Sequence, residues 1–111
     1  MKLIQQIEVC CPVLDDAPLS ARDAERMAAG FKVLSDPARL RTLSLIAAQP
    51  GMECCVCDLT KPLRLTQPTV SHHLKVLHQA GFLEREKRST WVYYRLVPKA
   101  LAVLCRALAA R

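Results

Sequence analysis

Residues 67–80, QPTVSHHLKVLHQA, have the pattern of an amphipathic helix. At about 100° per residue, Val70, Leu74 and Leu77 lie within about 60° of one another. The opposite side carries no acidic residue and consists of Pro68, Ser71, His72, Lys75 and Gln79, with Thr69 at its edge. An apolar face packs on a core, while short polar side chains opposite it reach base edges and phosphates. The stretch therefore predicts a DNA-recognition helix.

The N-terminal half of this helix holds most of the side chains that we expect to contact DNA, because that end usually enters the major groove. These residues are Gln67, Thr69, Ser71 and His72, with Lys75 better placed for the phosphate backbone. An ordinary solvated face is the alternative interpretation of Gln67 and Ser71. His73 borders the apolar face, so we predict a hydrogen-bonded core histidine there.

Three further helices are expected upstream. The first spans residues 20–34, with Ser20 as its N-cap, and has an apolar stripe at helical spacing. The second spans 37–48 with Asp36 as its N-cap, and a short third helix spans 56–63. The expected core residues of the second helix are Leu40, Leu43, Ile46 and Ala47.

Downstream of Gly81 the pattern changes to that of strands. Residues 82–87 and 91–96 predict two strands joined by a turn at 88–90. Pro98 opens a last helix, whose apolar stripe consists of Leu101, Leu104, Cys105 and Leu108. Four helices, a hairpin and a final helix predict a mainly α fold with a β-hairpin wing, that is, a winged helix-turn-helix.

Basic residues gather around the expected recognition helix and hairpin. The chain has a net charge of +6, yet residues 1–60 carry more acidic than basic residues. Residues 61–95 carry seven Lys or Arg against Glu84 and Glu86. A nucleic-acid footprint has this distribution, and a basic surface kept for solubility explains it equally well. Lys87 and Arg88, at the hairpin tip, are expected to contact DNA.

The length of 111 residues, 51% of them hydrophobic, fits one core. Pro12, Asp15-Asp16 and Pro18 break any long helix at the start, so residues 1–17 are predicted to be an arm carrying Cys10 and Cys11. Residues 18–111 would form the DNA-binding and dimerisation domain. The N-terminus is a poor signal peptide and no apolar run approaches the ~18 residues of a membrane span, so a cytoplasmic protein is expected.

Five of the six cysteines are clustered, at Cys10-Cys11 and at Cys54, Cys55 and Cys57. Neighbours this close cannot brace a fold, and cytosolic thiols stay reduced, so ion binding is favoured over disulfides. Thiolates suit soft ions such as arsenite, antimonite, cadmium or lead. Cys55 and Cys57 can face one ion if the backbone is extended there, and the following helix N-terminus is expected to help keep their thiolates deprotonated.

Four motifs, in order along the chain, resemble the ArsR/SmtB family of metal-responsive repressors. Residues 31–40 (FKVLSDPARL) are similar to the family's opening motif, and 53–59 (ECCVCDL) resemble its metal box. Residues 67–77 (QPTVSHHLKVL) resemble its recognition helix, and AGFL at 80–83 with WVYY at 91–94 resemble its wing. The resemblance covers roughly residues 20–96.

The resemblance implies a homodimer, joined mainly through the first and last helices, that binds double-stranded operator DNA when unloaded and releases it when the ion binds. It implies a repressor of the arsenical-resistance type, induced by As(III) or Sb(III), with Cd(II) or Pb(II) left open and no organic cofactor. Zinc sensing in the family uses His and carboxylate ligands on the last helix, and residues 98–111 have neither.

Two departures from the family's box matter. Thr60 stands where the arsenic sensors have a third cysteine, and Cys54 replaces a leucine. Because other members bring arm cysteines to the box, often from the partner subunit, the resemblance implies the ligand set Cys10, Cys11, Cys55 and Cys57. Cys54 is left open as a substitute ligand, and Cys105 is interpreted as a small buried residue at the dimer contact.

Ion capture at this box would shift or partly unwind the start of the helix that precedes the recognition helix. Such a shift changes the spacing of the two recognition helices of a dimer and weakens both DNA contacts. The alternatives are a thiol-based redox enzyme and an oxidant sensor of the same fold. A redox dithiol usually sits as Cys-x-x-Cys on a βαβ scaffold, and this sequence predicts no such scaffold, so an enzyme is not expected.

Overall fold

The computed structural model of the chain describes residues 18–108, and the arm cysteines Cys10 and Cys11 lie outside this range. In chain order the helices are α2 (Ala21–Leu34), α3 (Pro37–Ala47), α4 (Cys57–Leu63), α5 (Gln67–Gln79) and α6 (Pro98–Ala107). A 3-10 turn (Pro50–Met52) and strand β1 (Glu53–Cys55) precede α4, and β2 (Leu83–Arg88) and β3 (Trp91–Leu96) separate α5 from α6. The predicted winged helix-turn-helix is confirmed.

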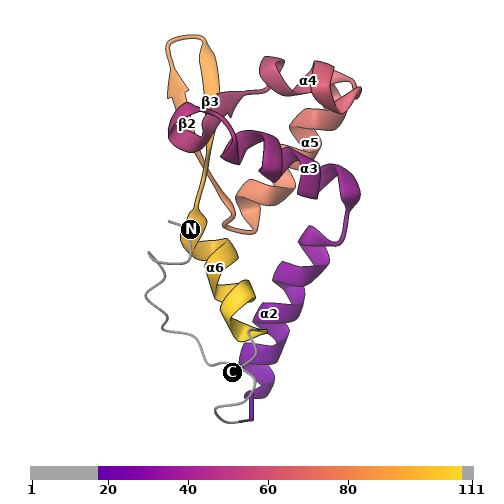
Figure 1. Ribbon diagram of the computed structural model, residues 1–111, viewed down its shortest axis with the longest axis vertical. Helices are drawn as coiled ribbons and strands as arrows, with labels where there is room; N and C mark the ends of the chain where they lie inside the picture. The colour runs from indigo at the N-terminus through magenta and orange to yellow at the C-terminus, as the bar shows by residue number, and fades with distance from the viewer. Residues whose placement is uncertain (1–17, 109–111) are drawn as a thin grey trace.

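The elements form two groups along the molecule (Figure 1). The α3, α4 and α5 helices and the sheet make up one end, and α2 and α6 lie together at the other end. The sheet is antiparallel with strand order β1-β3-β2, so β3 pairs on both sides. Among the described residues, no helix has both the length and the apolar character needed to cross a membrane.

Local signals set the helix starts as expected. The Ser20 side chain accepts a hydrogen bond from the backbone N–H of Asp23, which caps α2. The Asp36 carboxylate accepts from the N–H groups of Ala38 (2.8 Å) and Arg39 (3.1 Å), which caps α3 and holds the pKa of Asp36 below its usual value. Gly81 follows α5 with φ +90°, a conformation that favours glycine.

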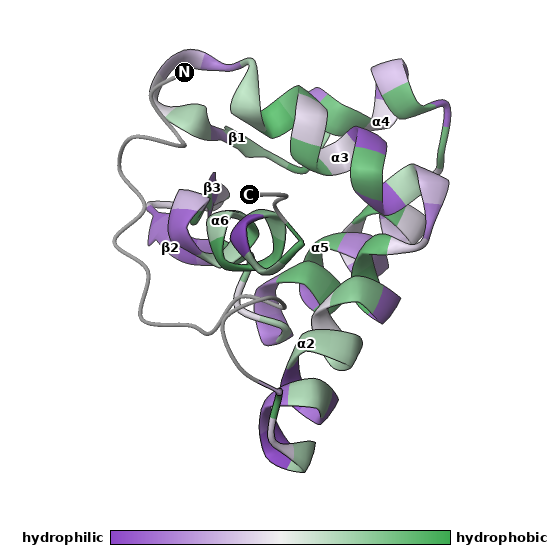
Figure 2. Cartoon of the chain, turned by 60° about the horizontal axis from the view of Figure 1, so that its bottom comes forward, coloured by the Kyte–Doolittle hydropathy of each residue, from purple (hydrophilic) through white to green (hydrophobic). Residues whose placement is uncertain are grey.

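The core lies between α3, α5 and the sheet. Ile46, Val70, Leu74 and Leu77 are fully buried there, and Leu43, Leu59, Phe82 and Leu96 pack around them. In Figure 2 α6 is mostly apolar, whereas β2 is mostly hydrophilic, as its sequence LEREKR requires.

The buried face of α3 differs from the prediction at two positions. Leu40, expected in the core, is 51% exposed, while Thr42 is fully buried and its hydroxyl donates to the Ala38 carbonyl at 2.7 Å. The face is centred near Ile46, and Leu40 lies about 110° around the helix from that centre. The hydroxyl of Thr42 satisfies its own hydrogen bond within the helix, so a polar residue is tolerated inside.

Strand β1 was not predicted, because three residues are too few to show an alternating pattern. It pairs with β3 so that Cys54 lies opposite Tyr94 and Cys55 opposite Tyr93. The cysteine box is therefore joined by strand pairing to the wing, and not only by the chain to α4.

Candidate nucleic-acid interface and metal centre

The α5 helix presents its polar face as the sequence predicts. Val70, Leu74 and Leu77 are fully buried against the core, and Gln67, Thr69, His72 and Lys75 are exposed on the other side. Ser71 is half-buried. The polar face of α5 that we predict to contact DNA is thus exposed along most of the helix.

The start of α5 is fixed by its N-cap. The Thr66 hydroxyl accepts a hydrogen bond from the backbone N–H of Thr69 (3.4 Å) and lies 2.9 Å from the Thr69 hydroxyl. The Thr69 side chain is therefore oriented toward the cap, and a contact between Thr69 and DNA has to share this hydroxyl.

Arg88, at the wing tip, is held by neighbouring carboxylates. Its guanidinium forms ion pairs with Glu53 of β1 and Glu86 of β2, and it lies over the Tyr93 ring at 4.5 Å from the centroid. The hydrogen bond from Arg88 lowers the pKa of Glu53, and the two carboxylates raise the pKa of Arg88. Lys87, beside it, is exposed, and no ion pair of Lys87 is found within residues 18–108.

The cysteine box brings together two of the predicted ligands and one residue that the sequence interpretation missed. The sulfurs of Cys55 and Cys57 and a carboxylate oxygen of Asp58 all lie within 4.8 Å of one another. Cys55 ends β1, Cys57 begins α4 and Asp58 is the next residue. The thiol of Cys55 donates to Asp58 Oδ2 at 3.3 Å, and the backbone N–H of Cys55 donates to the same oxygen at 3.4 Å.

Asp58 was not among the predicted ligands, although it belongs to the motif of residues 53–59. It lies three residues after Cys55, so the turn at Val56 folds its carboxylate back onto the end of β1. The E-C-C-V-C-D spacing alone did not show this, because the direction of the carboxylate depends on where the strand stops and the helix begins.

Burial favours the protonated form of the two strand cysteines. It raises the pKa of the Cys54 thiol to about 12. It also raises the pKa of Cys55 to about 11, and the side-chain hydrogen bonds with Cys57 and Asp58 act in the same direction. The expectation that the helix N-terminus helps keep the thiolates deprotonated was wrong for Cys55, because Cys55 lies in a buried strand beside a carboxylate.

The other cysteines do not join this cluster in the part of the chain that the structure describes. Cys54 is 3% exposed and its side chain packs in the core, so it is not part of the cluster of Cys55, Cys57 and Asp58. Cys105 was expected to be buried at a dimer contact, and it is exposed on α6 in the single chain. No structural statement applies to Cys10 and Cys11, which lie outside residues 18–108.

Two histidines of α5 differ from the sequence interpretation. His73 was predicted to be a hydrogen-bonded core residue, but its Nδ1 is buried and has no hydrogen-bond partner within the described residues. His78, which had no predicted role, lies with Nδ1 3.0 Å from the Leu83 carbonyl and packs edge-on against Tyr94. His78 thus connects the end of α5 to the wing.

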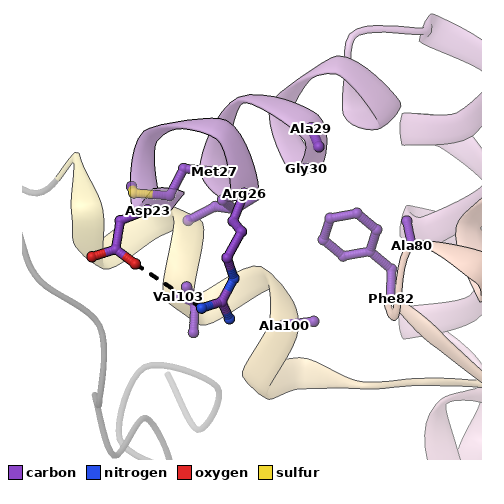
Figure 3. A pocket seen from close by; sticks show the side chains of 10 residues that line it. Asp23, Arg26, Met27, Ala29, Gly30, Ala80, Phe82, Ala100 and Val103 are labelled. Carbon is purple, nitrogen blue, oxygen red and sulfur yellow. Dashed lines mark ion pairs between the residues drawn. The ribbon is translucent and has the colours of Figure 1, made fainter. Parts of the chain in front are cut away.

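Two hollows lie beside these elements. One, of about 450 Å³, is bounded by α2, α6 and Phe82, with the Asp23–Arg26 ion pair (4.0 Å) at its rim (Figure 3). Gly30 lies on its α2 wall, and a Cβ there would stand 3.2 Å from Leu104. The other hollow, of about 520 Å³, lies between α5 and the wing and includes Val56 from the cysteine box.

Residues 36–85 match the model of a family described as "Bacterial regulatory protein, arsR family". The arsenic resistance transcriptional regulator ArsR1 of Pseudomonas putida is 48% identical over 69 residues, which cover 62% of this chain and 52% of that protein. The chain thus spans about half the length of that relative.

Two solved structures show the same fold. The AntR antimony-specific transcriptional repressor is 31% identical, with a TM-score of 0.69 and 86% of each chain covered. A homodimeric winged helix-turn-helix DNA-binding domain from Mycobacterium bovis, of a possible ArsR-family regulator, is 26% identical, with a TM-score of 0.65 and 80% of this chain and 83% of that one covered.

These matches confirm the family that the sequence motifs resemble and the winged helix-turn-helix that they imply. They also confirm the prediction of a DNA-binding regulator rather than an enzyme. The matched residues 36–85 include the cysteine box, the recognition helix and the start of the wing. The chain belongs to the arsR family of bacterial regulatory proteins.

Proposed function

We propose that the chain is a metalloid-responsive transcriptional repressor. As a homodimer joined through α2 and α6, it binds operator DNA in the cytoplasm when unloaded, and it releases the DNA when As(III) or Sb(III) binds its cysteine thiolates. The names of two similar proteins, an arsenic resistance regulator and an antimony-specific repressor, support this choice of inducer.

The observation that carries the proposal is the convergence of Cys55, Cys57 and Asp58 at the start of α4. Sulfur donors on a short strand-to-helix turn suit a thiophilic ion. Cys57 is exposed and Cys55 lies just beneath it, so an ion can approach the pair from solvent.

A three-sulfur site needs one more thiolate, because Thr60 replaces the family's third box cysteine. We assign this ligand to the arm of residues 1–17, at Cys10 or Cys11. Cys54 is less suitable, since it is packed in the core and burial raises its pKa to about 12. An ion held this way would tie the arm to the turn between β1 and α4.

Ion capture has two routes to the DNA-binding surface. Along the chain, Cys57 begins α4, which packs on α5. Across the sheet, Cys55 is paired with Tyr93 of the wing, and Val56 lines the hollow between the wing and α5. A shift of this turn therefore changes the relation of recognition helix and wing, with a coupling of about 1–3 kcal/mol, roughly 5- to 150-fold in affinity.

On the DNA side we assign base contacts to the exposed N-terminal part of α5 and phosphate contacts to its flanks. Gln67, Thr69, Ser71 and His72 would face base edges, and Lys75 and Lys87 phosphates. Arg88 is already paired with Glu53 and Glu86, so it would reach DNA only if these ion pairs opened.

The test is a fluorescence-anisotropy titration of the reduced protein with a duplex from beside its own coding region. Arsenite should lower the DNA affinity of the wild type by roughly 5- to 150-fold. Unchanged affinity in arsenite would refute the proposal.

Cysteine variants separate sensing from folding. Cys57→Ser should bind DNA like the wild type but should not release it in arsenite, whereas Cys105→Ser, a control at an exposed thiol of α6, should still respond. Loss of DNA binding by the unloaded Cys57→Ser protein would assign Cys57 a structural role instead. X-ray absorption of the loaded protein then counts sulfurs: three fit As(III) or Sb(III), and four fit Cd(II).

A further inference from the structure

The hollow between α5 and the wing has a basic residue on each of its two walls, beside the apolar side chains of Val56 and Val92. Ser71, Lys75 and Gln79 form part of its α5 wall, and Arg85 of β2 faces them from the wing. None of the residues that line this hollow is acidic. A concave surface with positive charge on two opposed elements is complementary to a phosphate group.

The wing has two chemically different faces, because successive residues of a strand point to opposite sides. Arg85 is paired with Tyr94, which lines the hollow, and Lys87 with Val92, which also lines it. Arg85 and Lys87 therefore share the face toward α5. Glu84, Glu86 and Arg88 belong to the opposite face.

The arginines of these two faces differ in how their charge is compensated. Arg88 has two carboxylate partners, Glu53 and Glu86, and an aromatic ring beneath it. Within residues 18–108, Arg85 and Lys75 form no ion pair. The charges of Lys75 and Arg85 in the hollow are therefore available to an anion, whereas the charge of Arg88 is already compensated.

We propose that this hollow binds a backbone phosphate of duplex DNA, with Lys75 and Arg85 supplying the charge, and that Arg85 rather than Arg88 is the wing's main phosphate contact. The inference rests on the proposed DNA-binding function and adds a residue that neither the sequence motifs nor the family match assigns.

The test measures DNA affinity of the metalloid-free, reduced dimer as a function of salt. Arg85→Gln removes one charge per subunit and two per dimer, so the slope of log K against log salt should become less negative by about 2, at roughly 0.9 per phosphate contact. Affinity near physiological salt should fall about tenfold or more. Lys75→Gln should behave similarly.

Two matched variants control for net charge. Arg88→Gln removes the same charge from the same hairpin and should change the slope by less than half as much as Arg85→Gln. Lys99→Gln, at an exposed position of α6, should leave slope and affinity unchanged. Wild-type behaviour of Arg85→Gln, or an equal or larger loss in Arg88→Gln, would overturn the inference.

A charge-conserving variant guards against a purely structural effect. Arg85→Lys should restore most of the slope, because a lysine can also neutralise a phosphate. If Arg85→Lys binds as poorly as Arg85→Gln although both melt like the wild type, Arg85 does not act through its charge and the inference fails. A wild type that binds no duplex at all would instead refute the proposed function itself.

Discussion

The two ends of the molecule bury their apolar residues to very different degrees. Around α3, α5 and the sheet, Ile46, Val70, Leu74 and Leu77 are fully buried. At the other end α6 buries Ala102, Leu104 and Ala107, but α2 has no buried residue and Leu108 of the α6 C-cap is 57% exposed. A hollow of about 450 Å³ lies between α2, α6 and Phe82 (Figure 3). One end therefore packs on itself, while the other leaves apolar surface that a second copy of the chain would cover.

Under the proposed function, the two ends have different roles. The packed end holds α5, the wing and the cysteine box on one core, so under the proposed function a displacement at the box would be transmitted to the DNA-binding surface. The open end carries the helices that we propose to form the dimer. In the proposed dimer, α2 and α6 would set the spacing of the two recognition helices, and the packed ends would contact DNA.

Truncating a core leucine should show the largest difference between the ends. Leu74→Ala should lower the free energy of unfolding by about 2–5 kcal/mol, because it leaves a cavity in a fully packed site. Leu108→Ala should change the stability of the single chain by about 0.5 kcal/mol or less. Urea unfolding at a protein concentration below the dissociation constant of the dimer measures both for the single chain. Equal losses would mean that the open end is as well packed as the core.

A charge at the open end should affect assembly rather than folding. Leu108→Glu places a carboxylate on the exposed apolar surface, so it should weaken dimerisation about tenfold or more, which is about 1.4 kcal/mol. Sedimentation equilibrium measures the dissociation constant, and circular dichroism should show unchanged helix content. A dimer of unaltered affinity would place the interface elsewhere.

Alkaline pH should reveal the burial of the Cys54 thiol at the packed end. The pKa of Cys54 is raised from 9.0 to about 12 in the fold, so the unfolded chain loses this proton first. The contribution of the neutral thiol to stability is complete below pH 9 and is lost as the pH rises from 9 toward 12. In Cys54→Ala the free energy of unfolding should fall less steeply over this range, whereas Cys105→Ala should follow the wild type. Parallel curves for Cys54→Ala and the wild type would contradict the burial of this thiol.

Most of the fold could be predicted because its signals are local. Ser20, Asp36 and Thr66 cap their helices through side-chain hydrogen bonds within three residues, and the apolar face of α5 follows from its spacing alone. The misplacement of Leu40 and the missed strand β1 have a common cause. Both depend on tertiary contacts with segments that are distant in the sequence. Neither a single apolar residue nor a three-residue strand is enough to predict those contacts.

The sequence predicted two of the three residues of the Cys55–Cys57–Asp58 cluster, but not how these residues are arranged. The motif of residues 53–59 identifies Cys55 and Cys57, yet it does not show that Asp58 folds back onto Cys55 or that Cys54 points into the core. On the wing, the sequence predicts Lys87 and Arg88 equally as DNA contacts. Only the strand register shows that Arg88 lies on the same face of the wing as Glu84 and Glu86. Arg85 lies on the other face, which lines the hollow.

The sequence by itself determined the helices, the two strands of the wing, the family and the clustering of Cys54, Cys55 and Cys57, because periodicity, capping and motif spacing are properties of neighbouring residues. The tertiary structure decided which thiols are buried and which arginine is already paired. Those properties depend on desolvation and on charges from distant segments, such as Glu53 beside Arg88, and these act only once the chain has folded.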